Sequence, residues 1–202
     1  KKIKFIPNGY DLSFLKPHKI QKKNFKKKLK IKNQVPLIGN VARYDPKKDH
    51  INLLNALSII RSKKLHFFCL FVGSKINKKN TILVSEIKRL KLTKYIKLLG
   101  RNDNILQVMN GLDIYIQSSS YGEGFPNVVA ESMACGTPSI VTDVGDASFI
   151  VSKTGWVVPP NNPIKLAKAI EMALSEFSTK NWKKRSSKAR SRIQKNFQIS
   201  KM

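Results

Sequence analysis

The polar residues most able to do chemistry lie between Tyr121 and Pro138, in the stretch YGEGFPNVVAESMACGTP. Glu123 and Glu131 are eight positions apart, and a Gly-Phe-Pro-Asn turn follows the first of them. The glycines on either side of Glu123 permit unusual backbone dihedrals and a close approach to a ligand. A helix that begins near Pro126 would direct its free N–H groups and the positive end of its dipole at this loop. The stretch therefore predicts an anion-binding site.

Glu131 falls well inside that predicted helix, beside apolar positions. A carboxylate that faces a cleft can accept hydrogen bonds from two vicinal hydroxyls, such as those of a ribose. Glu123 would then meet hydroxyl groups on the far side of a bound phosphate. A single glutamate on a helix is, however, more often a solvated surface residue, so both interpretations of Glu131 remain open at this point.

A second polar group occurs in the stretch ARYDPKKD, where Arg43 leaves a predicted strand and Lys48 follows five residues later. Two cations near the start of a helix would suit a diphosphate. In a chain with this many basic residues, the alternative is a pair of solvent-exposed side chains on a loop. A third group is TDVGDASF, in which Asp143 and Asp146 flank Gly145. We favour Asp146 as the capping residue of a short helix.

Other motifs of catalysis and metal binding are missing from the sequence. It contains no G-x-S-x-G, Walker A or G-x-G-x-x-G pattern. The three histidines are scattered and have no evident carboxylate or cysteine partner, which favours packing or surface roles for all three. Cys69 and Cys135 form no Cys-x-x-Cys pair, so a zinc site is not expected. Two free buried thiols are typical of a reducing compartment.

The elements that must position these residues alternate between strands and helices. Apolar runs of strand length occur at 35–44, 66–73, 95–100, 112–120, 137–143 and 155–160. Amphipathic runs of helix length occur at 49–64, 80–92, 104–111, 126–134, 162–177 and 180–195. This alternation predicts a doubly wound α/β fold, with a mostly parallel, Rossmann-like sheet and helices on both faces. Ligands of such a fold bind at the carboxyl ends of the strands, where all three polar groups lie.

Two details of the helices can be checked. In the helix predicted over 80–92, we expect Ile82 to face inward together with Leu83 and Ile87. Gly111 and Gly136 each follow an apolar periodic run, and both are candidates for the left-handed residue that ends a helix.

The charge is strongly basic, with a formal net value of +27, and it is unevenly distributed. Lysines concentrate at 16–32 and 180–195, whereas 102–160 contains one lysine, no arginine and six acidic residues. A charge of this size favours polyanionic partners such as anionic lipid, although a general bias toward lysine would produce the same excess. This centre is not basic, which argues against a nucleic-acid module. No apolar run approaches the ~20 residues that a membrane helix needs.

Five stretches, taken in order, carry a family resemblance: IPNGYD, GNVARYDPKKD, LLGRNDN, LDIYIQSSSYGEGFPNVVAESMACGTPSIVTDVGD and TGWVVPP. Together they resemble the C-terminal, donor-binding domain of family 4 retaining glycosyltransferases of the GT-B fold (glycosyl transferases group 1). The resemblance covers about residues 5–198 and is nearest to bacterial enzymes that build O-antigen, capsule and other surface polysaccharides. The spacing of Glu123 and Glu131, with Gly-Phe-Pro-Asn between them, is its most specific part.

The resemblance implies a role for each matching residue. Arg43 and Lys48 match the cations on the diphosphate of a nucleotide sugar, and Glu123 matches a glutamate beside the transferred sugar. Glu131 matches the ligand of the ribose hydroxyls, and Arg101 lies where the base is held. The turn whose backbone contacts sugar and phosphate corresponds to Gly124, Phe125, Pro126 and Asn127. The family often has two glycines after the second strand; here only Gly73 remains, so we expect a backbone contact with phosphate at Gly73 alone.

The resemblance also implies a division of the chain and a set of partners. Residues 1–34 would be an interdomain connector and basic segment, 35–178 the nucleotide-sugar-binding domain, and 179–202 a basic helix that returns toward an N-terminal acceptor domain missing from this sequence. The chain alone would bind donor without catalysis. The expected donor is a UDP-linked hexose or N-acetylhexosamine, transferred with retention and without a bound metal. The acceptor would be a glycan or a lipid-linked molecule. The enzyme would be cytoplasmic, or peripheral at the inner face of the cell membrane.

Two alternatives remain. One is another GT-B enzyme, such as a sucrose or trehalose-phosphate type synthase. The other is a non-catalytic module that binds nucleotide sugars or polyanions. The overall charge supports this alternative, and the lack of basic residues in the centre opposes it.

Overall fold

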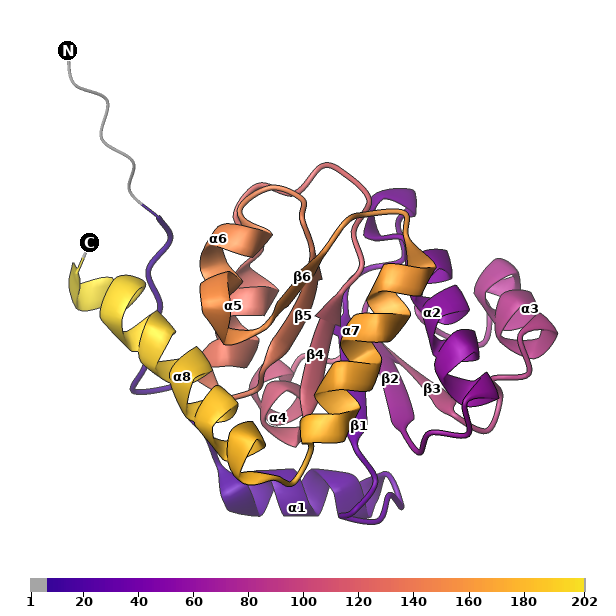
Figure 1. Ribbon diagram of the computed structural model, residues 1–202, viewed down its shortest axis with the longest axis horizontal. Helices are drawn as coiled ribbons and strands as arrows, with labels where there is room; N and C mark the ends of the chain where they lie inside the picture. Colours follow the sequence, from indigo (N-terminus) through magenta and orange to yellow (C-terminus); the bar gives the residue numbers. More distant parts are fainter. Residues whose placement is uncertain (1–6, 202) are drawn as a thin grey trace.

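The computed structural model describes residues 7–201 and contains a six-stranded sheet in which every neighbouring pair of strands is parallel (Figure 1). The strands are β1 Leu37–Val41, β2 Phe68–Val72, β3 Ile96–Gly100, β4 Ile114–Gln117, β5 Ser139–Thr142 and β6 Trp156–Val158. Their order is β3-β2-β1-β4-β5-β6, so the direction of winding reverses between β1 and β4. The predicted doubly wound, Rossmann-like fold is confirmed.

Helices cover both faces of the sheet (Figure 1). One face carries α2 His50–Ser62, α3 Thr81–Arg89 and α7 Pro163–Glu176. The other carries α4 Ile105–Gly111, α5 Asn127–Ala134, α6 Ala147–Val151 and α8 Lys180–Asn196, with α1 Lys19–Lys28 packed against α4. Three short 3₁₀ turns complete the described elements: η1 Pro46–Lys48, η2 Ser152–Thr154 and η3 Ile199–Lys201. Because both faces are covered, β1, β4 and β5 are buried along their whole length.

Two expectations about helices need correction. Leu83 and Ile87 face the core, but Ile82 is 61% exposed. Residues four apart, such as Leu83 and Ile87, share one face of a helix, and Ile82 does not lie on that face of α3. Gly136 has φ +76° and follows Cys135, the C-cap residue of α5, so it ends that helix as predicted. Gly111 is instead the last residue inside α4, and a Cβ there would lie 2.1 Å from the ring of Phe25. The small residue lets α1 pack closely on α4.

The basic segment before β1 is partly structural. Lys26 of α1 is only 3% exposed, and its Nζ lies 2.5 Å from Asp113 Oδ2 at the start of β4. Lys22 contacts the other carboxylate oxygen at 2.7 Å, and the backbone N–H of Leu37 donates to Asp113 at 2.8 Å. These contacts tie α1 to the amino ends of β1 and β4. Residues 1–6 and 202, which belong to the predicted terminal segments, lie outside the described residues.

The two ends of the described chain lie side by side. The N–H of Tyr10 donates to the carbonyl of Phe197 at 2.8 Å, and the N–H of Ile199 donates to the carbonyl of Tyr10 at 3.1 Å. Phe197 follows α8 directly and is buried, as is Tyr10. Within residues 7–201, no helix has both the length and the apolar character required to cross a bilayer.

Candidate functional site

A hollow opens at the carboxyl ends of β1 and β4, where the strand order reverses. Open α/β sheets bind their ligands at such a point. The loops that follow the two strands run to opposite faces of the sheet, and this leaves a crevice between them. The hollow is lined by the end of β1, the end of β4, the following loop and the start of α5: Asn40, Val41, Ala42, Lys48, Tyr115, Gln117, Ser118, Ser119, Glu123, Phe125, Pro126, Asn127 and Val128. Five of the residues expected from the sequence therefore line one cavity: Lys48, Glu123, Phe125, Pro126 and Asn127.

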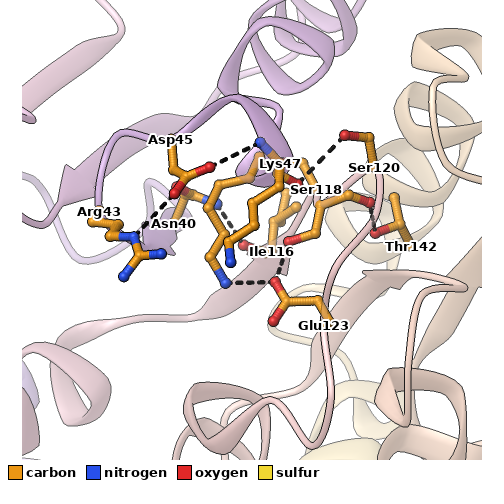
Figure 2. Close-up of polar contacts among 11 residues, drawn as sticks. Asn40, Arg43, Asp45, Lys47, Ile116, Ser118, Ser120, Glu123 and Thr142 are labelled. Carbon is orange, nitrogen blue, oxygen red and sulfur yellow. Dashed lines mark hydrogen bonds and ion pairs between the residues drawn. The ribbon is translucent and has the colours of Figure 1, made fainter.

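Lys48 is held in place by its own backbone turn. Asp45 caps η1 by accepting a hydrogen bond from the N–H of Lys47 at 3.1 Å (Figure 2). The loop after β4 also binds this turn, since the N–H of Ser120 donates to the Lys47 carbonyl at 2.8 Å. Ser118 Oγ donates to the carbonyl of Lys48 itself at 2.9 Å. The turn that carries the cation is thus anchored to the strand end that carries Glu123.

Lys48 and Glu123 are in direct contact beside the carboxyl end of β4. Lys48 Nζ lies 2.5 Å from Glu123 Oε1, and Ser119 Oγ donates to the same oxygen at 2.5 Å. The Glu123 side chain is only 8% exposed. Burial alone would raise the pKa of this carboxyl, but the hydrogen bonds from Lys48 and Ser119 and the charge of Lys48 outweigh it, so the pKa lies below its usual range. Glu123 is therefore a fixed carboxylate at neutral pH.

The loop around Glu123 rests on the loop after β5. Gly145 has φ +57°, and a Cβ there would lie 2.4 Å from the Glu123 carbonyl oxygen and 2.5 Å from that of Gly124. The N–H of Asp146 donates to the Gly124 carbonyl at 2.9 Å. Asp146 does occupy the N-cap position of α6, but its side chain makes no capping hydrogen bond, so the expected capping is wrong. The backbone of this loop supports the site instead.

Helix α5 begins as the sequence predicts, with Pro126 at its N-cap position, and no side chain among residues 7–201 caps its first N–H groups. Those groups and the positive end of the helix dipole lie at the hollow that Pro126, Asn127 and Val128 line. Glu131 is half-buried one turn further on, and burial raises the pKa of its carboxyl. A partly desolvated carboxylate of this kind is a strong acceptor for hydroxyl groups.

Asn8 and Tyr10 also reach the site, and sequence reasoning missed them. Tyr10 Oη donates to Asn127 Oδ1 at 2.6 Å, and Asn8 Nδ2 donates to the same oxygen at 2.9 Å. The Asn-Gly dipeptide at positions 8 and 9 predicts only a turn. Nothing local in the sequence signals that this turn lies against α5, more than a hundred residues away.

Five expected residues are not among those that line the hollow: Arg43, Gly73, Arg101, Gly124 and Glu131. Arg43 adjoins Ala42 at its rim, but its Nε pairs with Asp45 at 3.1 Å (Figure 2). Arg101 follows the edge strand β3, is 82% exposed and pairs with Asp103. Gly73 has a clear packing requirement, because a Cβ would lie 2.0 Å from the Ala42 carbonyl oxygen. The ligand roles of these residues remain predictions.

His50 begins α2 close behind Lys48, and it is a packing residue. Its ring lies between those of Tyr44 and Phe71, with centroids 5.5 and 5.8 Å away. Burial, and next the charge of Lys48, lower the pKa of His50 to about 4. The ring is therefore neutral at physiological pH and adds no charge to the site.

The arrangement suits a ligand that carries both anionic groups and hydroxyls. An ammonium group and unsatisfied helix N–H groups lie on the same cavity and attract phosphate. Glu123 provides an acceptor for hydroxyl groups in the cavity, whereas Glu131 lies one turn further along α5 and does not line it. Lys48, Glu123 and the start of α5 come together where the strand order reverses.

Comparison with known proteins agrees with this geometry. The family model described as "Glycosyl transferases group 1" matches residues 21–192. Among curated proteins, the chain is similar to the putative glycosyltransferase EpsF of Bacillus subtilis, with 27% identity over 142 residues, which cover 70% of this chain and 36% of EpsF.

Solved structures show the same fold. A glycosyltransferase from Rickettsia africae has a TM-score of 0.87 and 28% identity, over 96% of this chain and 52% of that one. Anabaena HepE, crystallised with UDP, has a TM-score of 0.84 at 22% identity, over 96% of this chain and 53% of HepE. The chain thus spans about half of these solved proteins and about a third of EpsF.

Proposed function

The chain belongs to the glycosyl transferases group 1 family, and we propose that it is the donor-binding domain of a retaining enzyme that transfers a sugar from a nucleotide diphosphate. The observation that carries this proposal is the contact of Lys48 with Glu123 beside the free N-terminus of α5. It joins a phosphate-binding cation to a sugar-binding carboxylate at the strand ends where this fold binds ligands.

The diphosphate is the leaving group, and its negative charge grows as the bond to the sugar breaks. Lysine has three N–H donors, and Glu123 takes only one, so Lys48 can also donate to phosphate oxygens. Arg43, whose side chain is exposed, can leave its partner Asp45 and add a second cation. The N–H groups at the start of α5 complete this stabilisation. Because protein cations supply the charge, we propose that transfer needs no bound metal; full activity in EDTA is expected, and activity that requires an added divalent ion would contradict it.

The sugar and nucleoside lie on either side of the diphosphate in this proposal. Lys48 and Ser119 both bond to Oε1 of Glu123, so Oε2 can accept from a hydroxyl of the transferred sugar. Glu131 accepts from the two ribose hydroxyls, and Arg101 approaches the base. UDP is the proposed nucleotide, which the presence of UDP in the HepE crystal supports.

Binding measurements test the donor role directly. Calorimetric titration of the chain with UDP, GDP, ADP and a DNA duplex should give binding to one nucleotide and none to DNA. Lys48→Ala should weaken that binding, while Lys63→Ala, which removes a surface lysine paired with Glu171, serves as the control. Equal affinity for DNA and for all three nucleotides would instead support the polyanion-binding module.

The proposed acceptor is a glycan or a lipid-linked sugar in bacterial surface polysaccharide synthesis, bound by an N-terminal domain in the complete enzyme. In that enzyme, the anomeric configuration of the product, followed by NMR, should match that of the donor. Inversion would contradict the retaining mechanism. Turnover by the 202-residue chain alone would contradict the need for a second domain.

We also propose that the enzyme is cytoplasmic and binds peripherally at the inner face of the membrane. Residues 12–44 and 177–202 contain no acidic residue. Each lysine near an anionic bilayer contributes about 1 kcal/mol to the free energy of membrane binding. Co-sedimentation with anionic vesicles should fall with rising salt and be absent with neutral vesicles. Binding that ignores both would exclude this attraction.

A further inference from the structure

The turn that opens α5 is held by both ends of the described chain. Tyr10 bonds to Asn127, and its ring also stacks on Phe125, with centroids 6.5 Å apart and planes at 26°. Phe197, from the other end, packs edge-on against the same Phe125 ring at 5.6 Å. Because Phe197 and Ile199 fix the backbone of Tyr10 on either side, its hydroxyl reaches Asn127 from a rigid support.

The contacts of Asn127 determine which way its amide group faces. A side-chain amide has an oxygen that accepts and a nitrogen that donates. Tyr10 Oη and Asn8 Nδ2 both direct donors at Oδ1 of Asn127. A flipped amide would set its NH₂ group against the NH₂ group of Asn8, which is unfavourable. The nitrogen of Asn127 is therefore the atom left to meet a ligand in the hollow that this residue lines.

We propose that Asn8 and Tyr10 are positioning residues, which orient the Asn127 amide so that its Nδ2 donates to a phosphate oxygen of the bound nucleotide. This inference rests on the proposed function and adds a side-chain donor to the backbone groups of α5. Neither Asn8 nor Tyr10 touches the ligand in this arrangement.

The ionisation of Tyr10 is consistent with this role. Burial, and next the negative charge of Glu131, raise the pKa of the Tyr10 phenol above its usual range. The hydroxyl therefore keeps its proton at physiological pH and acts as a donor to Asn127.

Tyr10→Phe tests the hydroxyl alone, because the ring and its stacking on Phe125 remain. In calorimetric titration of the 202-residue chain with UDP, we expect this variant to bind about fivefold to tenfold more weakly than wild type. Tyr95→Phe is the matched control, since Tyr95 stacks on Phe67 beside β3. It should bind UDP as wild type does.

A double-mutant cycle separates positioning from a general effect on the fold. In an Asn127→Ala background, Tyr10→Phe should change UDP affinity less than about twofold, because the group that it orients is gone. Asn127→Asp keeps an acceptor for Asn8 and Tyr10 but lacks the donor. It should melt close to wild type and bind UDP at least about tenfold more weakly.

Two results would overturn the inference: wild-type affinity in Tyr10→Phe, or the same loss from Tyr10→Phe with and without Asn127. Either can be seen only if the wild-type chain binds UDP. If it binds GDP or ADP instead, the same cycle is run with that nucleotide. A wild-type chain that binds none of the three would refute the proposed function, which is a different outcome.

Discussion

Lys48 and Glu123 lie 75 residues apart in the sequence, yet their Nζ and Oε1 atoms are 2.5 Å apart at the carboxyl end of β4. The contact joins the turn after β1 to the loop after β4, across the point where the strand order reverses. It brings into one unit two residues that the sequence suggested separately.

Removing the cation should impair transfer more than folding. In the complete enzyme, we expect Lys48→Ala or Arg43→Ala to lower the rate of sugar transfer by ~100-fold or more, because each loses a group that stabilises the leaving diphosphate. Steady-state kinetics with the nucleotide sugar measures this effect. Lys63→Ala is the control, and near-normal turnover in both site variants would rule out the electrostatic role.

The pair should also give the fold a pH dependence. The pKa of Glu123 is lower in the folded chain than in the unfolded one, so its stabilising contribution is present above the unfolded value of about 4.3 and is lost as pH falls through the folded value. Urea unfolding should show wild type more stable than Glu123→Gln at pH 7, and the difference should shrink below about pH 4. A difference that is constant with pH would contradict this.

Glu131 should behave in the opposite way. Burial raises the pKa of this carboxyl in the folded chain, so the charged form destabilises the fold once pH exceeds the unfolded value. Glu131→Gln should therefore raise the free energy of unfolding at pH 7 and leave it unchanged near pH 3. The same variant should bind UDP about tenfold more weakly, since a carboxylate is the better acceptor for ribose hydroxyls. Loss of both stability and affinity would indicate a structural role.

Two glycines near Glu123 should respond differently to alanine. Gly145→Ala places a methyl group against two carbonyl oxygens at a positive φ, and we expect it to cost about 1–3 kcal/mol of stability. A Cβ at Gly124 would have no neighbouring atom within 4 Å, so Gly124→Ala should fold normally and weaken only the binding of the donor. Thermal melts and UDP titrations of the two variants distinguish a glycine that supports the loop from one that contacts the donor.

The buried pair at the other end of the sheet should matter for stability alone. Asp113→Ala leaves Lys26 buried without its carboxylate and is expected to destabilise the chain by about 3–5 kcal/mol. Asp103→Asn, which breaks the exposed pair with Arg101, should change stability by less than about 1 kcal/mol. Denaturant unfolding measures both, and similar losses in the two variants would show that burial of Lys26 is unimportant.

Local sequence patterns predicted the strands, most of the helices and five of the residues that line the hollow. Apolar runs separate clearly from amphipathic ones, and Pro126 and Gly136 bound α5 as their backbone preferences require. The errors come from packing contacts that a local sequence pattern cannot show. Ile82 lies outside the buried face of α3, and Gly111 is small because Phe25 of a distant helix packs on it.

The sequence by itself determined the alternating strands and helices, the three polar loops and the family resemblance, because these depend on residue type and short-range spacing. Only the tertiary structure decided which loops meet. Strand order is set by the packing of whole layers, and it is this order that brings Lys48 to Glu123. The same packing brings Asn8 and Tyr10 against Asn127. Contacts between residues so far apart in the chain depend on the packed core, and no short pattern encodes them.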